Sequence, residues 1–198
     1  MPSSNFAHAG ITRSHPLVVP DGYHLVERRT LLGSGHRVHD RALRTISRWG
    51  TKTRAGFRVR PSVDRVREGA YFLVTIGLGP FSIREPVQVS WVDAAGFGYG
   101  TLAGHPLSGE EAFLVEQDDA DLVWFVNRSV SRPASRGWQL LSPFLSLAQG
   151  FFVRRYGRVM RRASRPSRRS SRTRWSPRGS RNPPDGSGPR TTPAASTS

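Results

Sequence analysis

The arrangement of apolar and polar positions predicts a first strand followed by a helix. The segment 22–32 is rich in β-prone residues and predicts the strand, and the Gly33–Gly35 turn follows it. Apolar residues then recur at helical spacing, with arginines at positions between them. This apolar stripe consists of Val38, Ala42, Ile46 and Trp49. Gly50 follows the stripe and is expected to end the helix.

The middle of the chain has the pattern of short strands. Six β-prone segments follow the helix, some alternating apolar and polar positions and others nearly continuous in apolar residues. They cover residues 57–60, 71–78, 87–91, 97–102, 112–117 and 122–130. The nearly all-apolar segment 71–78 predicts a strand that is covered on both faces. Because the segments are neighbours in sequence, we expect an antiparallel sheet of about six or seven strands.

A long helix is predicted after these strands. Ser142 and Pro143 have the residue types of an N-cap and a first helical position. Apolar residues then repeat at spacings of three and four, at Leu145, Ala148, Phe152, Tyr156 and Val159. A shorter helical stretch, 134–141, precedes this helix. The predicted fold class is α+β, with a curved antiparallel sheet that packs on the C-terminal helix and buries a core or encloses a cavity.

The C-terminal segment differs in composition from the rest of the 198-residue chain, whose formal net charge is +16. Residues 161–198 hold ten arginines and one acidic residue, and they have almost no aliphatic side chains that could bury a core. We therefore expect a flexible N-terminal arm at 1–19, a single domain at 20–163 and a disordered tail rich in Arg, Ser and Pro at 164–198.

Other features of the composition exclude several classes of protein. The chain has no cysteine, which excludes disulfides and thiolate metal sites. Its longest apolar stretch, 140–153, is too short and too polar to span a bilayer, and no secretory signal is recognisable. These features predict a cytoplasmic protein. Lys52 is the only lysine among 30 basic residues, a bias that resembles the codon usage of a GC-rich genome.

Candidate chemistry is concentrated in the glycine-rich stretch 96–113, which predicts a binding loop around His105. Glu110 and Glu111 are adjacent, so on a strand they point to opposite faces and only one can share a cavity with His105. A His–Glu couple could perform general acid–base catalysis, as in a hydrolase or cyclase. Alternatively, His105 begins a turn and one glutamate pairs with an arginine at the sheet edge.

Four sequence pieces resemble the uncharacterised family "domain of unknown function nineteen-ninety" (DUF1990). They are Leu32-Gly33-x-Gly35 before a helix ending in Trp49, the segment 55–62, the segment 96–113, and Ser131-Arg132-Pro133 leading to Arg154-Arg155-Tyr156. The resemblance covers residues 20–162 and excludes the basic tail. Leu107 departs from the pattern, which usually has an acidic residue there. The resemblance implies a helix-grip fold, like that of START and Bet v 1 proteins, which holds hydrophobic ligands between sheet and helix.

The resulting expectation is a domain that binds a hydrophobic or amphipathic small molecule without catalysis. Candidate ligand-binding residues are Tyr99, His105, Glu110, Trp91, Trp124, Asn127 and Phe152. No catalytic residue, metal site or cofactor is assigned. One alternative is an enzyme that uses His105 with Glu110 or Glu111. Another is weak, salt-dependent association of Arg161–Arg181 with nucleic acid or other anions. The alternative for this tail is a solvated extension that binds nothing.

Overall fold

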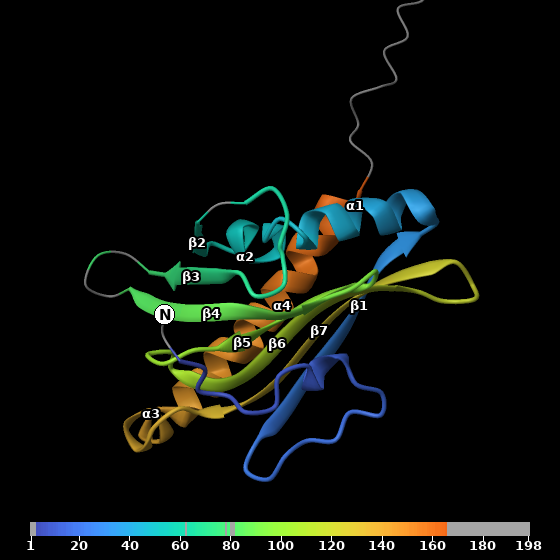
Figure 1. Cartoon of the computed structure of the whole chain (residues 1–198). Coiled ribbons are helices and arrows are strands. Elements are labelled where there is room, and N and C mark those ends of the chain that lie inside the picture. Colours follow the sequence, from blue (N-terminus) through green and yellow to red (C-terminus); the bar gives the residue numbers. More distant parts are fainter. Residues whose placement is uncertain (1–2, 62, 78, 80–81, 166–198) are drawn as a thin grey trace, which may run out of the picture. The chain divides into compact units, whose positions relative to one another are not determined.

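The structure is a computed structural model that describes residues 3–61, 63–77, 79 and 82–165 (Figure 1). The elements are η1 (Ile11–Arg13), β1 (His24–Ser34), α1 (His36–Ile46), α2 (Gly50–Arg54), β2 (Arg58–Arg60), β3 (Tyr71–Ile76), β4 (Ile83–Val92), β5 (Gly96–Thr101), β6 (Leu107–Gln117), β7 (Leu122–Pro133), α3 (Arg136–Leu140) and α4 (Ser142–Ser164). Among these residues, no helix is both long enough and apolar enough to cross a membrane.

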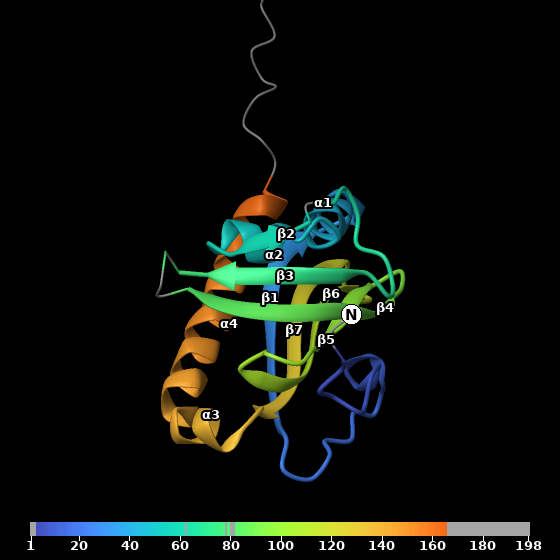
Figure 2. The same cartoon turned by 60° about the vertical axis from the view of Figure 1, so that its left-hand side comes forward.

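The strands form one seven-stranded antiparallel sheet in the order β1-β7-β6-β5-β4-β3-β2. Strands β2 to β7 are therefore a meander, and β1 pairs beside the last strand of that meander. Figures 1 and 2 show the sheet bending around α4, with α1 and α2 on the same side as α4. This arrangement confirms the predicted α+β, helix-grip architecture and the predicted C-terminal helix.

Cross-strand neighbours on the inner face of the sheet change from apolar to polar along the strands. Toward α1, the inner face carries Phe97, Phe113 and Phe125, which join Ile46 and Trp49 in the main hydrophobic core. Further along the same strands, the inner positions are occupied by polar or charged side chains. These positions are Glu85, Tyr99, Thr101, Glu111, Asn127, Ser129 and Ser131. The polar end of this face lies opposite the N-terminal half of α4, and it forms one side of a cavity.

The glycine-rich stretch forms β5 and the start of β6, with only residues 102–106 between them, so the predicted binding loop is largely sheet. Its glycines allow close packing. A Cβ on Gly98 would lie 2.3 Å from Trp91 Nε1. Because a real Cβ contact is never this close, Gly98 makes room for the indole ring of Trp91 on the neighbouring strand.

Helix α1 ends differently from the prediction that Gly50 stops it. The residue in the left-handed conformation is Trp49, with φ of 58°, and Gly50 is instead the first residue of α2. A Cβ on Gly50 would lie 2.5 Å from the carbonyl oxygen of Thr45, so glycine is required here by close backbone packing. The resulting turn places Trp49 in the core and directs α2 over the polar end of the sheet.

Segment 71–78 was predicted to be a strand covered on both faces, and this prediction is wrong for the residues described. In β3, Phe72 and Val74 are buried, while Tyr71 is 38% exposed. An antiparallel strand with one solvated face can still carry apolar residues on that face, so the apolar run alone did not determine its burial.

Residues at the N-terminus, expected to form a flexible arm, contact the outer face of the sheet, which is the face away from α4 (Figure 2). The Glu110 carboxylate accepts hydrogen bonds from the backbone N–H of Gly10 (2.7 Å) and of Thr12 (2.9 Å). Arg128 donates to the carbonyl oxygen of Thr12 (2.9 Å) and pairs with Glu27 at 2.6 Å. These contacts tie η1 to strands β6 and β7.

Candidate functional site

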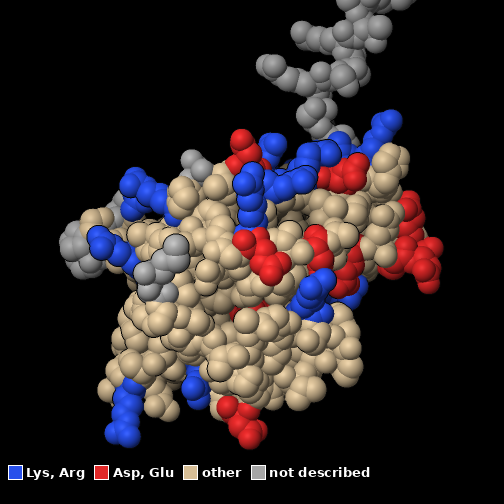
Figure 3. Space-filling view, in the orientation of Figure 1, with Lys and Arg blue, Asp and Glu red and all other residues tan. Residues whose placement is uncertain are grey.

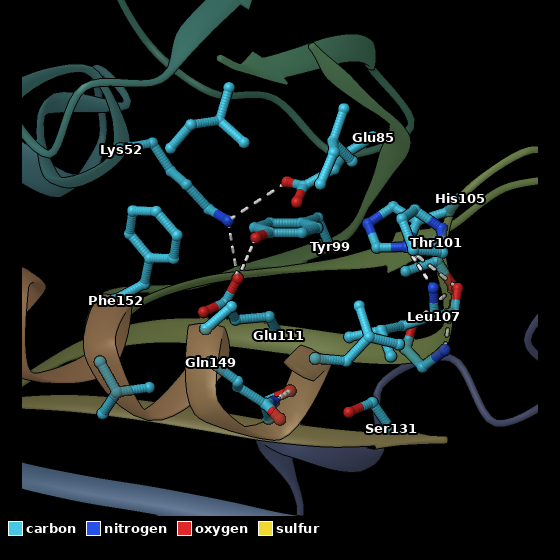
Figure 4. Close-up of a pocket in the computed structure, with 18 of the residues that line it drawn as sticks. Lys52, Glu85, Tyr99, Thr101, His105, Leu107, Glu111, Ser131, Gln149 and Phe152 are labelled. Atoms are coloured by element: carbon cyan, nitrogen blue, oxygen red, sulfur yellow. Dashed lines mark hydrogen bonds and ion pairs between the residues drawn. The ribbon is translucent and has the colours of Figure 1, made fainter. Parts of the chain in front are cut away.

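A cavity of about 130 Å³ lies between the polar end of the inner sheet face and the N-terminal half of α4 (Figure 4). Apolar side chains from the sheet, the loop before β2 and α4 form much of its wall. They are Phe57, Ile76, Ile83, Leu145, Ala148 and Phe152. Cavities of roughly 150 Å³ in other proteins can hold a benzene-sized molecule. The cavity therefore has room for a small organic group.

Lys52 extends from α2 into this cavity, and the residue is 4% exposed. Its Nζ lies 3.1 Å from Glu111 Oε2 and 3.7 Å from Glu85 Oε2. The ammonium also lies 4.6 Å from the ring centroid of Phe57. A lysine places a compact charge at the end of a flexible stem, whereas an arginine would bring a wide planar fork. The space between two carboxylates and an aromatic ring therefore suits lysine.

Glu111 has its hydrogen-bonding capacity largely filled by protein groups. The hydroxyl of Tyr99 donates to Oε2, the oxygen that also faces Lys52 (Figure 4). The side-chain amide of Asn127 donates to Oε1 at 3.0 Å. These partners come from β5, α2 and β7, so Glu111 is the point at which three elements are joined.

Glu85 is different, because among the described residues its carboxylate has only the long ion pair with Lys52. Its side chain is 18% exposed and lines the cavity. Burial raises its pKa above the ordinary value, against the opposing charge of Lys52. Glu85 is therefore the acidic group of this site with oxygens free to accept a hydrogen bond from a bound molecule.

The charges of the site fix the protonation of Lys52 and Tyr99. Burial alone would lower the pKa of Lys52, but the negative charge of Glu111 and the other acidic groups around it outweigh burial, so that pKa lies well above its ordinary value. Burial raises the pKa of Tyr99, and the charge of Glu111 raises it further. Lys52 is thus a cation and Tyr99 a neutral donor at neutral pH, which leaves neither of them as a ready nucleophile.

His105 lines the same cavity but forms no couple with a glutamate in the described part of the chain. Its Nδ1 accepts a hydrogen bond from the backbone N–H of Leu107 at 2.9 Å. Burial lowers its pKa to about 3, with a further contribution from the charge of Lys52. The imidazole is therefore neutral over the physiological range, and the acid–base couple considered from the sequence is not assembled.

Glu110, the other partner proposed for His105, directs its carboxylate to the outer face of the sheet. Besides the backbone of the N-terminal arm, its carboxylate accepts a hydrogen bond from Trp91 Nε1 at 3.3 Å. Glu110 is 1% exposed and lies among the residues around the cavity, although its carboxylate is bonded on the opposite side of the sheet. Its geometry assigns it to anchoring the arm.

The remaining predicted residues separate into two groups. Tyr99 and Phe152 line the cavity, and Asn127 lies behind Glu111, to which it donates. Trp91 and Trp124 lie away from the cavity. Trp91 packs in the smaller outer hydrophobic cluster, because an irregularity in the pairing of β4 with β5 after Val89 changes the face on which it lies. Trp124 donates to an aspartate of the β6–β7 turn.

Sequence reasoning missed Lys52 and Glu85 as site residues. One signal for Lys52 was present, since it is the single lysine among 30 basic residues, but this bias was interpreted as codon usage and not as a sign of a site. The arginines of the tail beyond residue 165, proposed for anion binding, lie outside the described residues.

The chain is similar in sequence to a plant protein and to a bacterial protein. The chain is 31% identical over 144 residues to the UPF0548 protein At2g17695 of Arabidopsis thaliana, covering 68% of this chain and 70% of the plant protein. It is 35% identical over 124 residues to a UPF0548 protein of Deinococcus radiodurans, covering 63% of this chain and 59% of that protein.

Among solved structures, the hypothetical protein jhp0584 of Helicobacter pylori has a similar fold. It superposes with a TM-score of 0.51 at 12% identity, over 72% of this chain and 88% of that one. The family model described as "Domain of unknown function (DUF1990)" matches residues 5–159, which include most of the N-terminal arm, the residues that line the cavity and most of α4. The chain belongs to the DUF1990 family.

Proposed function

We propose that this domain binds a small amphipathic molecule in the cavity between the sheet and α4, without catalysing a reaction. The observation that carries the proposal is that one cavity combines apolar walls with the charged side chains of Lys52, Glu85 and Glu111. Ligand pockets typically combine mostly apolar lining with a few polar groups that fix the orientation of the ligand. Here the apolar walls would hold the body of the molecule, and Glu85 would orient its polar end.

The charges favour a ligand whose polar end donates hydrogen bonds. Two carboxylates face one ammonium in this cavity, and His105 adds no charge at neutral pH. The Lys52 charge is already paired with Glu111 at 3.1 Å, while Glu85 is only loosely paired. A hydroxyl or ammonium group at Glu85 would complete the site, whereas a carboxylate would meet a like charge.

Calorimetric titration of the full chain with hexylamine, hexanol and hexanoate tests this proposal. We expect hexylamine and hexanol to bind and hexanoate to bind at least about tenfold more weakly, since like charges in a buried site cost more than 1.4 kcal/mol. Glu85→Gln should weaken hexylamine binding, and Glu116→Gln, whose carboxylate pairs with Arg29 at 2.9 Å outside the cavity, should not. Equal binding of all three probes, or none at all, would contradict the proposal.

Space inside the cavity can be tested separately. Ala148 is exposed but lines the cavity, whereas Leu147, the preceding residue of α4, is 72% exposed and is not among the residues that line it. Ala148→Trp should obstruct the cavity and abolish probe binding, and Leu147→Trp places the same side chain on the outward side and should leave binding intact. Binding that survives Ala148→Trp would place the probe elsewhere on the protein.

A further inference from the structure

The outward side of α3 and of the first half of α4 carries large apolar side chains that no described residue covers. Figure 2 shows α4 along the outside of the domain. The exposed apolar ridge consists of Leu140 (84% exposed), Leu141 (45%), Phe144 (71%), Leu147 (72%) and Phe151 (48%). Contiguous exposed apolar surface of this kind marks an interaction site more often than an idle surface.

The same outward helix face continues as a row of arginines. Phe144, Leu147 and Phe151 are spaced by three and four residues, and Arg154 and Arg158 continue this spacing on α4. Both arginines are exposed. One helix face is therefore apolar in its first half and basic in its second half.

Acidic side chains are missing from this part of the sequence. Between Asp121 and Asp185 the chain has fifteen arginines and no aspartate or glutamate. Charged groups elsewhere are mixed, and Figure 3 shows basic and acidic side chains together on the upper part of the face in view. Helices α3 and α4 themselves therefore carry arginines and no acidic side chain.

We propose that the exposed apolar ridge docks on a bilayer that contains anionic lipids. Helices that lie in a membrane interface have aromatic and aliphatic residues on one side and arginines or lysines beside the phosphates. The ridge supplies the apolar side chains, and Arg154 and Arg158 reach the headgroups at its end. An acidic protein would match the arginines, but it would leave an aromatic ridge without a matching surface.

This docking would place the cavity next to the bilayer, although the proposal does not depend on a ligand. Leu145, Ala148 and Phe152 line the cavity from α4, and each is adjacent in sequence to a residue of the ridge. A molecule dissolved in the bilayer would then have a short route to the cavity.

Site-specific fluorescence can test the contact because the chain has no cysteine of its own. The variant Leu147→Cys carries the environment-sensitive dye NBD on its single cysteine. The matched control is Val18→Cys, because Val18 is 74% exposed and Leu147 is 72% exposed. Vesicles of phosphatidylcholine with one quarter phosphatidylglycerol should raise the NBD fluorescence at residue 147 and shift its emission to the blue. The NBD fluorescence at residue 18 should stay unchanged. Vesicles of phosphatidylcholine alone should have little effect.

Sedimentation with the same anionic vesicles separates the ridge from the arginine-rich tail. In the full chain, Phe144→Gln with Leu147→Gln should reduce vesicle binding about a hundredfold, since each lost apolar side chain contributes about one order of magnitude. Unchanged binding of this variant, or an unchanged NBD signal at 147 while the protein sediments, would overturn the proposal. A signal at 147 that rises with protein concentration without vesicles would also overturn it, in favour of a second copy of the chain.

Discussion

Replacing Lys52 with methionine removes the ammonium group that pairs with Glu111 and Glu85 in the cavity. Glu111 would keep its hydrogen bonds from Tyr99 and Asn127, but the Glu111 and Glu85 carboxylates would lose the opposite charge that they share. Removing one partner of a buried ion pair typically costs about 3–5 kcal/mol of the free energy of unfolding. Lys52 is 4% exposed and its Nζ lies 3.1 Å from Glu111, so we expect a loss within this range. Small domains have about 5–15 kcal/mol in total, so the variant should fold with a much lower urea midpoint.

Urea unfolding at pH 7, followed by tryptophan fluorescence, measures this loss, and a double-mutant cycle assigns it to the pair. Glu111→Gln removes the unpaired charge, so the Lys52→Met/Glu111→Gln variant should lose less than the sum of the single changes. We expect a coupling free energy of about 1–3 kcal/mol, as for other contacting residues. A cost below about 1 kcal/mol for Lys52→Met, with additive behaviour in the cycle, would refute the ion-pair reasoning.

Three further predictions concern other parts of the domain. The pKa of His105 is lowered to about 3 in the folded protein, so near pH 5 the unfolded chain binds more protons than the folded one. The free energy of unfolding should therefore fall as the pH drops through 6.5. In urea unfolding, the wild type should lose about 2 kcal/mol more than His105→Asn between pH 7 and pH 5. Gly157→Ala should destabilise the domain by about 1–3 kcal/mol, since its Cβ would lie 2.7 Å from Thr30 Oγ1, while Gly150→Ala on the same helix, with nothing within 4 Å, should be neutral or stabilising in thermal unfolding. Glu110→Gln should accelerate hydrogen exchange at the amide of residue 12, and the control change Glu116→Gln on the same strand should leave exchange at that amide unaffected.

Much of the fold could be predicted because its signals are local. Periodicity identified the long helix and most of the strands, and the order of those elements was enough to predict a curved antiparallel sheet around α4. The exceptions have local causes that a pattern cannot show. Gly50 is a close-packing glycine and Trp49 takes the left-handed conformation, which reverses the usual preference of the two residue types.

The candidate site was predicted less completely, because it depends on which face each side chain occupies. An irregularity after Val89 moves Trp91 to the outer face, and a one-residue change of register has this effect on any strand. The sequence predicted that Glu110 and Glu111 point to opposite faces of the sheet. Only the packing of α2, which brings Lys52 to Glu111, shows that Glu111 is the one on the cavity side. Glu85 lies in a strand segment with no motif around it, and it gave no signal.

The presence of a single lysine allows the most direct test of the ligand site. In a chain labelled with ¹⁵Nζ-lysine, Lys52 gives one side-chain resonance. Titration with hexylamine should shift this resonance saturably, and Ala148→Trp should abolish the shift. A Lys52 resonance that stays in place while hexylamine binds, or a shift that persists with the cavity filled, would contradict a ligand site between the sheet and α4.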